Sequence, residues 1–373
     1  MPPSSIALKI SAEDARRFVR RAVLLDTPAP DVATALAHHG YIQIDPINVC
    51  GRMHDLILRN RVAGYREGDL HQFIHSPARP GFEHYFPHAG ILVAFPAEAW
   101  PYLSPLIARR RLRRGAAYRR KLSPKHEALA QRILAEIAAR GPLTSDDIEH
   151  EGRSRTGWGS PGRLVKNLLE VMFVHGRVLI TGRRNFRRVY DLPERVLPAA
   201  LLATPGKSTA ETARWTALLR LRQRRLASLK RGEFPLVDDL VQPVVITGVK
   251  TPPLFILKSD LPLLELSTLS TQPSTAAQPP LLLAPLDPLV YDRRITSALW
   301  GFDYTWEVYT PPHKRQRGYY ALPVLAGHEI VGHVDPKADR PARRLRVMAR
   351  SVRRGHKIAP AIDELARWLG LRR

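Results

Sequence analysis

Three segments decide the fold class of this chain: HEALAQRILAEIAARG (126–141), SPGRLVKNLLEVMFVHG (160–176) and RVLITGRRNFRRVYDL (177–192). The first predicts an amphipathic helix ended by Gly141, and the second predicts a helix with one apolar stripe. The third predicts a β-hairpin whose turn contains Gly182 and four arginines. With a short middle helix over 142–150, this order predicts a winged helix, which places its third helix in a groove of nucleic acid and its wing on the phosphates.

The N-terminal region predicts helix, helix, strand and helix, an order compatible with an elaborated helix-turn-helix domain. Ser11 caps the first helix, and the second runs from Asp31 to Gly40. YIQIDPINV (41–49) alternates like a strand, and a third helix follows over 49–61.

Beyond residue 196 the sequence predicts a third winged-helix-like unit, a linker and a β-rich end. Short strands are expected in LLLAPLDPLV, YTWEVYTPP, RGYYALPVLAG and EIVGHVDPKAD, before a last helix over 358–371. The fold class is therefore α+β, with tandem winged helices and a small C-terminal antiparallel sheet or barrel. The predicted segments are 1–122 and 123–195 (winged helices), 196–266 (third such unit), 267–280 (linker) and 281–373 (β-barrel and helix).

Charge is the strongest compositional feature. Lys and Arg number 58 against 34 Asp and Glu, so the net charge is +24, while a hydrophobic content of 44% supports a packed core. Such an excess favours a polyanionic partner, first nucleic acid and then anionic membrane; a merely solvated arginine-rich surface is the alternative. The densest clusters are 109–121, 183–188 and 220–225.

Composition also excludes several classes. The single cysteine, Cys50, excludes a disulfide framework and multi-cysteine metal sites. No apolar run approaches the roughly 18–20 residues of a membrane span, and the first ten residues lack the pattern of a signal peptide. We expect a cytoplasmic, nucleoid-associated protein that needs no metal or other cofactor and no membrane.

The residues with most chemical interest are Gln43-Ile44-Asp45-Pro46. On a strand, the side chains of Gln43 and Asp45 share one face, and Pro46 biases Asp45 toward extended geometry. An amide beside a carboxylate can hold and activate a water molecule. Spacing alone favours a plain polar pair on an exposed strand face.

Two long segments, IQIDPINVCGRMHDLILRNRV (42–62) and 287–340, which begins DPLVYDRRITSALW and ends GHVDPKADR, resemble the crosslink-repair DNA glycosylases of the YcaQ- and AlkZ-like family. The resemblance implies tandem winged helices with a C-terminal β-barrel. It also implies hydrolysis of the N-glycosidic bond of N7-alkylguanine, including unhooking of interstrand crosslinks. AlkZ-like members use Gln-x-Gln and YcaQ-like members use Gln-x-Asp, so Gln43-x-Asp45 is similar to the second branch.

The implied roles are Asp45 as general base and electrostatic stabiliser, with Gln43 orienting the water. N7-alkylguanine is already cationic and leaves without a strong acid, while the sugar becomes oxocarbenium-like. The lysines nearest in sequence to this motif are Lys9 and Lys121, which favours a monofunctional hydrolase over a Schiff-base lyase.

Other positions are secondary candidates. His88 and Arg52 are candidates for active-site support, although Ala89 stands where the family pattern suggests an acid. His71-x₃-His75 and His84-x₃-His88 have helical ligand spacing but lack HExxH, so no metal is expected. The candidate DNA-contacting residues are Arg61, for which a structural ion pair is equally plausible, Arg183, Arg184, Arg187, Arg188 and Lys337.

Two other functions remain open at this point. A non-catalytic winged-helix DNA-binding or regulatory protein explains the charge and the wing, but gives no reason for Gln43-x-Asp45. A basic structural protein of the nucleoid is the third possibility. For the first function we expect a monomer acting on double-stranded DNA that carries alkylated or crosslinked guanine.

Overall fold

The structure is a computed structural model that describes residues 6–87, 90–112, 122–150, 152–155, 161–185, 187–269 and 279–373. The chain forms two compact units. Unit 1 consists of Met1–Gly40, Ile44–Asp69 and Ala217–Arg373, and unit 2 consists of Tyr41–Gln43 and Leu70–Thr216. The predicted domain boundaries stay predictions, and the α+β fold class is confirmed.

The first two helices of unit 1 begin and end where the capping residues predict. The Ser11 side chain caps α1 (Ala12–Ala22) by accepting from the Asp14 amide at 3.0 Å. Asp31 caps α2 (Val32–His39) in the same way. Gly40 ends α2 with φ +77°, and a β-carbon there would lie 2.5 Å from Leu219 Cδ2, so this position requires glycine.

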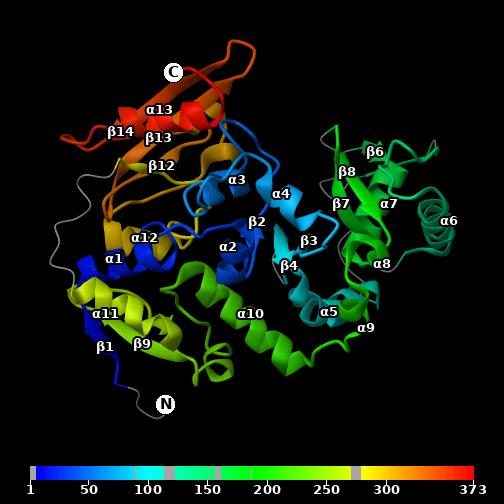
Figure 1. The fold of residues 1–373 in the computed structure, drawn as a ribbon, viewed down its shortest axis with the longest axis horizontal. Helices are drawn as coiled ribbons and strands as arrows, with labels where there is room; N and C mark the ends of the chain where they lie inside the picture. Colours follow the sequence, from blue (N-terminus) through cyan, green and yellow to red (C-terminus); the bar gives the residue numbers. More distant parts are fainter. Residues whose placement is uncertain are drawn as a thin grey trace. The chain divides into compact units, whose positions relative to one another are not determined.

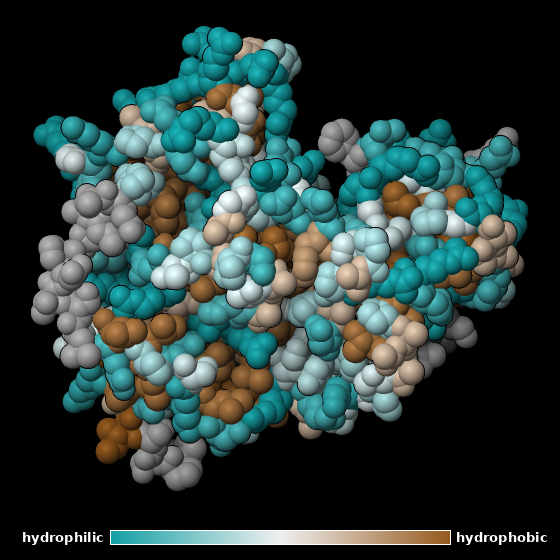
Figure 2. Space-filling model, in the orientation of Figure 1, coloured by the Kyte–Doolittle hydropathy of each residue, from teal (hydrophilic) through white to brown (hydrophobic). Residues whose placement is uncertain are grey.

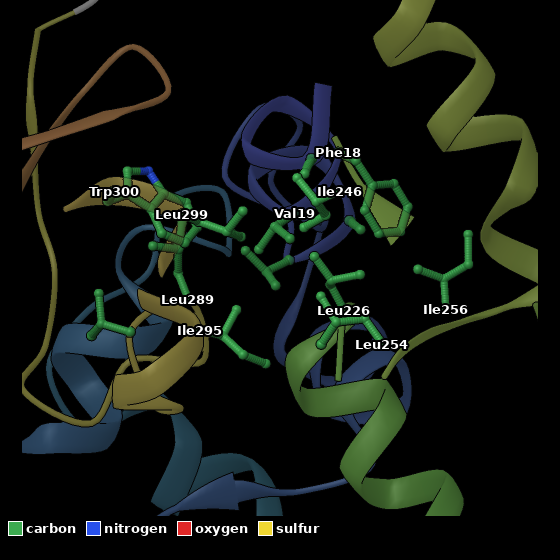
Figure 3. Packing of buried hydrophobic residues seen from close by; sticks show 14 of the residues in the cluster. Phe18, Val19, Leu226, Ile246, Leu254, Ile256, Leu289, Ile295, Leu299 and Trp300 are labelled. Carbon is green, nitrogen blue, oxygen red and sulfur yellow. The ribbon is translucent and has the colours of Figure 1, made fainter. Parts of the chain in front are cut away.

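One hydrophobic core of unit 1 joins α1 to a three-stranded sheet. β1 (Leu8–Ile10) pairs in parallel with β9 (Val241–Ile246), which pairs antiparallel with β10 (Leu254–Leu257). Figure 3 shows Phe18 and Val19 of α1 packed toward residues of this sheet and toward Leu299 and Trp300. The helices around this sheet are α10 (Thr209–Arg224), α11 (Leu261–Leu269) and α12 (Arg293–Trp300).

The C-terminal part of unit 1 contains a four-stranded antiparallel sheet. Its order is β11 (Leu281–Leu282), β12 (Leu322–Ala326), β13 (Glu329–Asp339) and β14 (Arg344–Val352). Helix α13 (Ala359–Trp368) lies beside these strands (Figure 1), and its apolar side chains share a core with the sheet and with α3 (Met53–Leu58). Figure 2 shows a largely hydrophilic surface at the tip of the β13–β14 hairpin.

Three predictions for this part of the chain need correction. The barrel is not confirmed, because β11 and β14 are the two edges of the sheet within the described ranges. The expected strand at 304–312 is a 3₁₀ turn (Glu307–Tyr309), because the Glu307 carboxylate binds backbone amides of the following loop and two prolines lack an N–H. Helix α11 continues through 267–269, where the linker was expected to begin, and 270–278 lie outside the described residues.

Unit 2 begins with a small sheet of order β2-β4-β3. Its strands are β2 (Ile42–Gln43), β3 (Gly81–Tyr85) and β4 (Leu92–Pro96). The helices that the chain forms next to this sheet in sequence are α4 (Asp69–Ile74) and α5 (Trp100–Leu112).

The winged-helix prediction is confirmed only in part. Helices α6 (Pro124–Arg140) and α7 (Leu164–Val174) form, as does the hairpin β7 (Leu179–Arg184) to β8 (Arg187–Asp191). Gly182 lies within β7, and the turn is at Asn185, whose φ of +48° asparagine tolerates. The remaining short elements are β5 (Arg153–Arg155), β6 (Pro161–Arg163), α8 (Pro193–Val196) and α9 (Ala199–Ala203).

The middle helix expected over 142–150 does not form. Residues 144–148 make turns. The Asp147 carboxylate accepts from both the Thr144 amide (2.7 Å) and the Thr144 hydroxyl (2.8 Å), which closes a local turn in place of a helix. The tandem winged-helix assignment therefore stays a prediction.

A buried ion pair connects two distant segments of unit 1. Arg61 and Asp287 both have side chains with no exposed surface. Their two nitrogen–oxygen contacts measure 2.8 and 2.6 Å, and Arg61 also donates to the Ile57 carbonyl at 2.9 Å. Arg61 was predicted to contact phosphate; that prediction is wrong for this structure because its guanidinium is enclosed and already paired.

Removal of one partner should strand the other charge in the core. We expect Asp287→Ala to lower the free energy of unfolding by about 3–5 kcal/mol in urea denaturation. The matched control is Asp363→Ala, because Asp363 pairs with Arg373 at 3.3 Å while both side chains are nearly half exposed. That change should cost less than about 1 kcal/mol. Equal losses for the two variants would contradict a structural role of the buried pair.

Candidate functional site

Asp45 lies just beyond the end of β2, in unit 1. Its side chain is half-buried, and Asp45 Oδ1 accepts from the Ile47 amide at 2.9 Å. Burial raises the pKa of Asp45 above that of an ordinary aspartate, while the Ile47 hydrogen bond opposes this shift. A partly desolvated carboxylate held by its own loop is suited to accept a proton.

The strand expected through residue 49 ends at Gln43. Pro46 has no N–H for a strand ladder, and the Asp45 carboxylate takes up the Ile47 amide in a turn. Gln43 is the last residue of β2, where it pairs with Val93. Because Asp45 lies outside the strand, alternation along a strand does not relate the two side chains. Gln43 is 8% exposed, and its Oε1 has no hydrogen-bond partner among the residues described.

The segment after Asp45 is tied to the end of β13. The Val49 carbonyl accepts from the Ala338 amide at 2.9 Å, and Asn48 Oδ1 accepts from Arg340 at 3.2 Å. The described side-chain hydrogen bond of Arg52 goes to Glu67, at 3.3 Å. Arg52 therefore stabilises this segment, and its predicted support of the active site stays a prediction.

Tyr320, which was not among the predicted site residues, is fully buried in unit 1. The negative charge of Asp45 is one of the causes that raise the pKa of Tyr320, after burial and Cys50. Its signal in the sequence was the run Arg317-Gly-Tyr-Tyr320, quoted within the family resemblance but assigned only to a strand.

All four arginines of the hairpin contact carboxylates of unit 2. Arg183 pairs with the fully buried Glu83, and Arg188 pairs with Glu170 on α7. Both arginines are about three-quarters buried, so they attach the hairpin to its own unit. The two with half-exposed side chains are Arg184, which pairs with Asp147, and Arg187, which pairs with Asp146.

Glu83 is contacted by His71 of α4, by His75 directly after α4, and by Arg183 of β7. His75 Nε2 lies 2.9 Å from its carboxylate and His71 Nε2 lies 3.7 Å away, while Arg183 approaches from β7. Burial raises the pKa of Glu83, but Arg183, His75 and His71 outweigh it, so the pKa is lowered. The two histidines of the His71-x₃-His75 motif thus share a buried carboxylate. Within the described ranges, no group of three or more candidate ligands could hold a metal ion.

The other predicted contacts are placed as follows. Lys337 is exposed on β13, opposite Arg346 of β14. His88 and Ala89 lie outside the described residues, as does most of the basic run 109–121. No helix in the described part of the chain is long and apolar enough to cross a membrane.

The fold is that of a known DNA glycosylase structure. The chain is similar to the solved structure of Streptomyces sahachiroi DNA glycosylase AlkZ, with a TM-score of 0.62, 15% identity and 98% of each chain covered. The family described as DNA glycosylase AlkZ-like matches residues 36–369. The chain therefore belongs to the AlkZ-like DNA glycosylase family, and the resemblance seen in the sequence is confirmed.

The lowered pKa of Glu83 makes its contribution to stability depend on pH. The contribution is complete above the pKa of an unfolded glutamate, near 4.5, and is lost as the pH falls toward the lower folded value. We expect Glu83→Gln to lower the free energy of unfolding by about 2–3 kcal/mol at pH 7, with a smaller difference from wild type at pH 3.

The control for this prediction is Glu136→Gln, which removes the partner of Arg140 on one exposed helix face. It should change the free energy of unfolding at pH 7 by about 0.5 kcal/mol or less. A Glu83→Gln penalty that stays constant from pH 7 to pH 3 would contradict an ionised, paired Glu83.

Proposed function

We propose that this protein is a monofunctional DNA glycosylase that hydrolyses the N-glycosidic bond of N7-alkylguanine and unhooks interstrand crosslinks made through that atom. The observation that carries the proposal is Asp45, a half-buried carboxylate just beyond the end of a strand in a chain of this family. The protein acts as a monomer on double-stranded DNA.

The chemistry assigns Asp45 two tasks. As the C1′–N9 bond breaks, its electron pair neutralises the cationic base and the sugar becomes oxocarbenium-like. The Asp45 carboxylate stabilises that positive charge and accepts a proton from the water that attacks C1′. Its raised pKa makes it a stronger base than an ordinary aspartate.

Gln43 orients the attacking water. Its buried Oε1 without a partner in the described part of the chain is a hydrogen-bond acceptor ready for a water proton. A Schiff-base mechanism needs a lysine beside the sugar. The lysines nearest to this motif in the sequence are Lys9 and Lys121, which favours simple hydrolysis.

Asp45→Asn tests the proposal directly. The amide keeps the shape of the side chain and can still accept from the Ile47 amide, but it cannot take a proton. We expect single-turnover release of 7-methylguanine from duplex DNA to fall by at least about 100-fold. A defined N7-guanine crosslink should likewise remain linked.

The control is Asp31→Asn, because Asp31 also accepts one backbone amide, from Thr34 at 2.7 Å, and the charge change is the same. Asp31→Asn should release base at the wild-type rate. Equal release by Asp45→Asn and wild type would refute the assignment of Asp45. Tight DNA binding by wild type without any base release would support the non-catalytic alternative.

The hairpin makes a separate prediction about DNA binding. If Arg184 and Arg187 exchange their exposed carboxylate partners for phosphates, replacement of both by alanine should reduce the slope of log K against log salt by about 1.8. Lys207→Ala is the control, because Lys207, which lies just before α10, also pairs with an exposed carboxylate, that of Glu211. A slope unchanged from wild type in the double variant would exclude phosphate contacts by these two arginines.

A further inference from the structure

We propose that a cluster of polar side chains, which begins three residues after Asp45, binds one backbone phosphate of the DNA beside the lesion. Its donors are Asn48, Arg52 and Arg340. The carboxylate of Glu67 takes the place of the phosphate while no DNA is bound. The inference rests on the proposed function of Asp45, because that function identifies the ligand as DNA. All four side chains of this Glu67 cluster belong to unit 1.

Three donors share a single oxygen atom of Glu67. Its Oε1 lies 3.4 Å from Asn48 Nδ2, 3.3 Å from a terminal nitrogen of Arg52 and 3.5 Å from a terminal nitrogen of Arg340. Hydrogen bonds from arginine to a carboxylate normally measure about 2.7–2.9 Å, so these contacts are long. One carboxylate oxygen therefore satisfies the three donors only weakly.

The Glu67 cluster has more positive than negative charge. Two guanidinium groups face one carboxylate, and a phosphodiester offers two charged oxygens, so each guanidinium can have its own acceptor. The side chains of Arg52 and Glu67 are about one-quarter exposed, and that of Arg340 is nearly half exposed, so a ligand in solution can reach them. An ion pair as exposed as this contributes little to stability, so exchange of the carboxylate for a phosphate costs little.

The loop that contains Glu67 is fixed by a buried carboxylate. Asp55 Oδ1 accepts from the Tyr65 hydroxyl at 2.7 Å and from the Gly68 amide at 3.0 Å. These bonds hold the chain on both sides of Glu67. The backbone therefore stays in place when the Glu67 side chain turns away.

The donors are held by bonds of their own. Asn48 Oδ1 accepts from the Gly51 amide at 3.1 Å and from Arg340 at 3.2 Å, which leaves Asn48 Nδ2 directed toward the centre of the cluster. The Val49 carbonyl accepts from the Ala338 amide at 2.9 Å, and this bond brings Arg340, in the turn after β13, to the segment that follows Asp45. A site built in advance loses little conformational freedom when a ligand binds.

The position along the chain places the bound phosphate close to the lesion. Asn48 is three residues after Asp45, and three residues span at most about 11 Å. The turn in which the Asp45 carboxylate binds the Ile47 amide lies within this span, so the segment is not fully extended. At about 3.4 Å of helix axis per nucleotide, the distance corresponds to about three nucleotides. The phosphate is therefore one that flanks the nucleotide whose base is released.

Glu67 competes with DNA for the two arginines. Its carboxylate must turn away when the phosphate binds, because two anions at the same place repel each other. A variant without this charge should bind DNA more tightly, whereas a Glu67 that only holds the segment together would give weaker or unchanged binding. The two roles thus predict opposite results.

The first test measures the affinity of Glu67→Gln for a short duplex with one 7-methylguanine on a 2′-fluorinated sugar. The fluorine disfavours the oxocarbenium ion, so the base stays attached. We expect binding about fivefold tighter than that of wild type, the effect of one charge at about 4 Å in water. The melting temperature should stay close to that of wild type, because the ion pairs are partly exposed.

The control for this test is Asp26→Asn. The Asp26 carboxylate is also one-quarter exposed and also pairs with two arginines of unit 1, Arg20 and Arg21. Its affinity for the duplex should equal that of wild type. An equal gain in Glu67→Gln and Asp26→Asn would reduce the effect to net charge and overturn the inference, as would a Glu67→Gln that binds no tighter than wild type.

The second test locates the phosphate. In the same duplex, the phosphates around the lesion are replaced one at a time by a neutral methylphosphonate. One replacement should weaken binding by wild type about tenfold, the usual effect of one hydrogen bond between charged groups. Arg340→Ala should not respond to that replacement, because it has already lost the contact.

Arg346→Ala is the control for Arg340→Ala, because it removes an exposed arginine from the same hairpin, one that pairs with Asp339 at 2.7 Å. It should respond to the methylphosphonate as wild type does. If Arg340→Ala responds as strongly as wild type at every position, Arg340 does not bind a phosphate and the inference is wrong.

Both tests measure binding and do not depend on base release. Full release of 7-methylguanine by Asp45→Asn would refute the proposed function of Asp45 and would leave the binding results standing. Failure of the Glu67→Gln and Arg340→Ala predictions would reject the phosphate site even if Asp45→Asn is inactive.

Discussion

The buried ion pair between Arg61 and Asp287 is the constraint on which the organisation of unit 1 depends. It joins the turn after α3 to the start of the C-terminal region, 226 positions further along the chain. Two charges in a core without exposed surface are tolerated only when each satisfies the other, so this contact specifies one arrangement of the two segments. The same two segments carry the family resemblance.

The loop before Tyr320 and the turn at Asp45 are held by the same kind of interaction. In both places a carboxylate accepts backbone amides of a loop and fixes it: Asp45 binds its own turn, while Glu307 and Asp335 bind the loop before Tyr320. Aspartate and glutamate are scarce in a chain with a net charge of +24. The buried carboxylates named here bind a guanidinium or backbone amides and so fix the segments that contain them.

The arginines show how little a net charge says about particular residues. Arg61 is enclosed in the core, Arg183 and Arg188 attach a hairpin to its unit, and only Arg184 and Arg187 of this group keep half-exposed side chains. An arginine that pairs with a buried carboxylate contributes to folding. An exposed one in a weak pair can exchange its partner for a phosphate at small cost.

The sequence by itself determined the class of fold, the caps of α1 and α2, the helices α6 and α7, the hairpin and the family. These depend on local signals such as a capping serine at residue 11, a glycine at residue 40 and apolar periodicity, and on two long segments of unusual sequence. Local sequence signals of this kind do not decide whether the barrel closes or whether a helix forms over 142–150. Strand closure is a long-range property, and at 144–148 two hydrogen bonds from Thr144 to the Asp147 carboxylate close a turn where the residue pattern predicted a helix.

Only the tertiary structure decided the environment of the candidate site. Sequence alternation placed Gln43 and Asp45 on one strand, but the strand ends at Gln43 because Pro46 cannot join the ladder and Asp45 caps a turn. Nothing local to the motif indicates the raised pKa of Asp45, which comes from burial of its carboxylate in the folded unit. Burial and pairing depend on which distant segments meet, and that is set by packing of the whole unit.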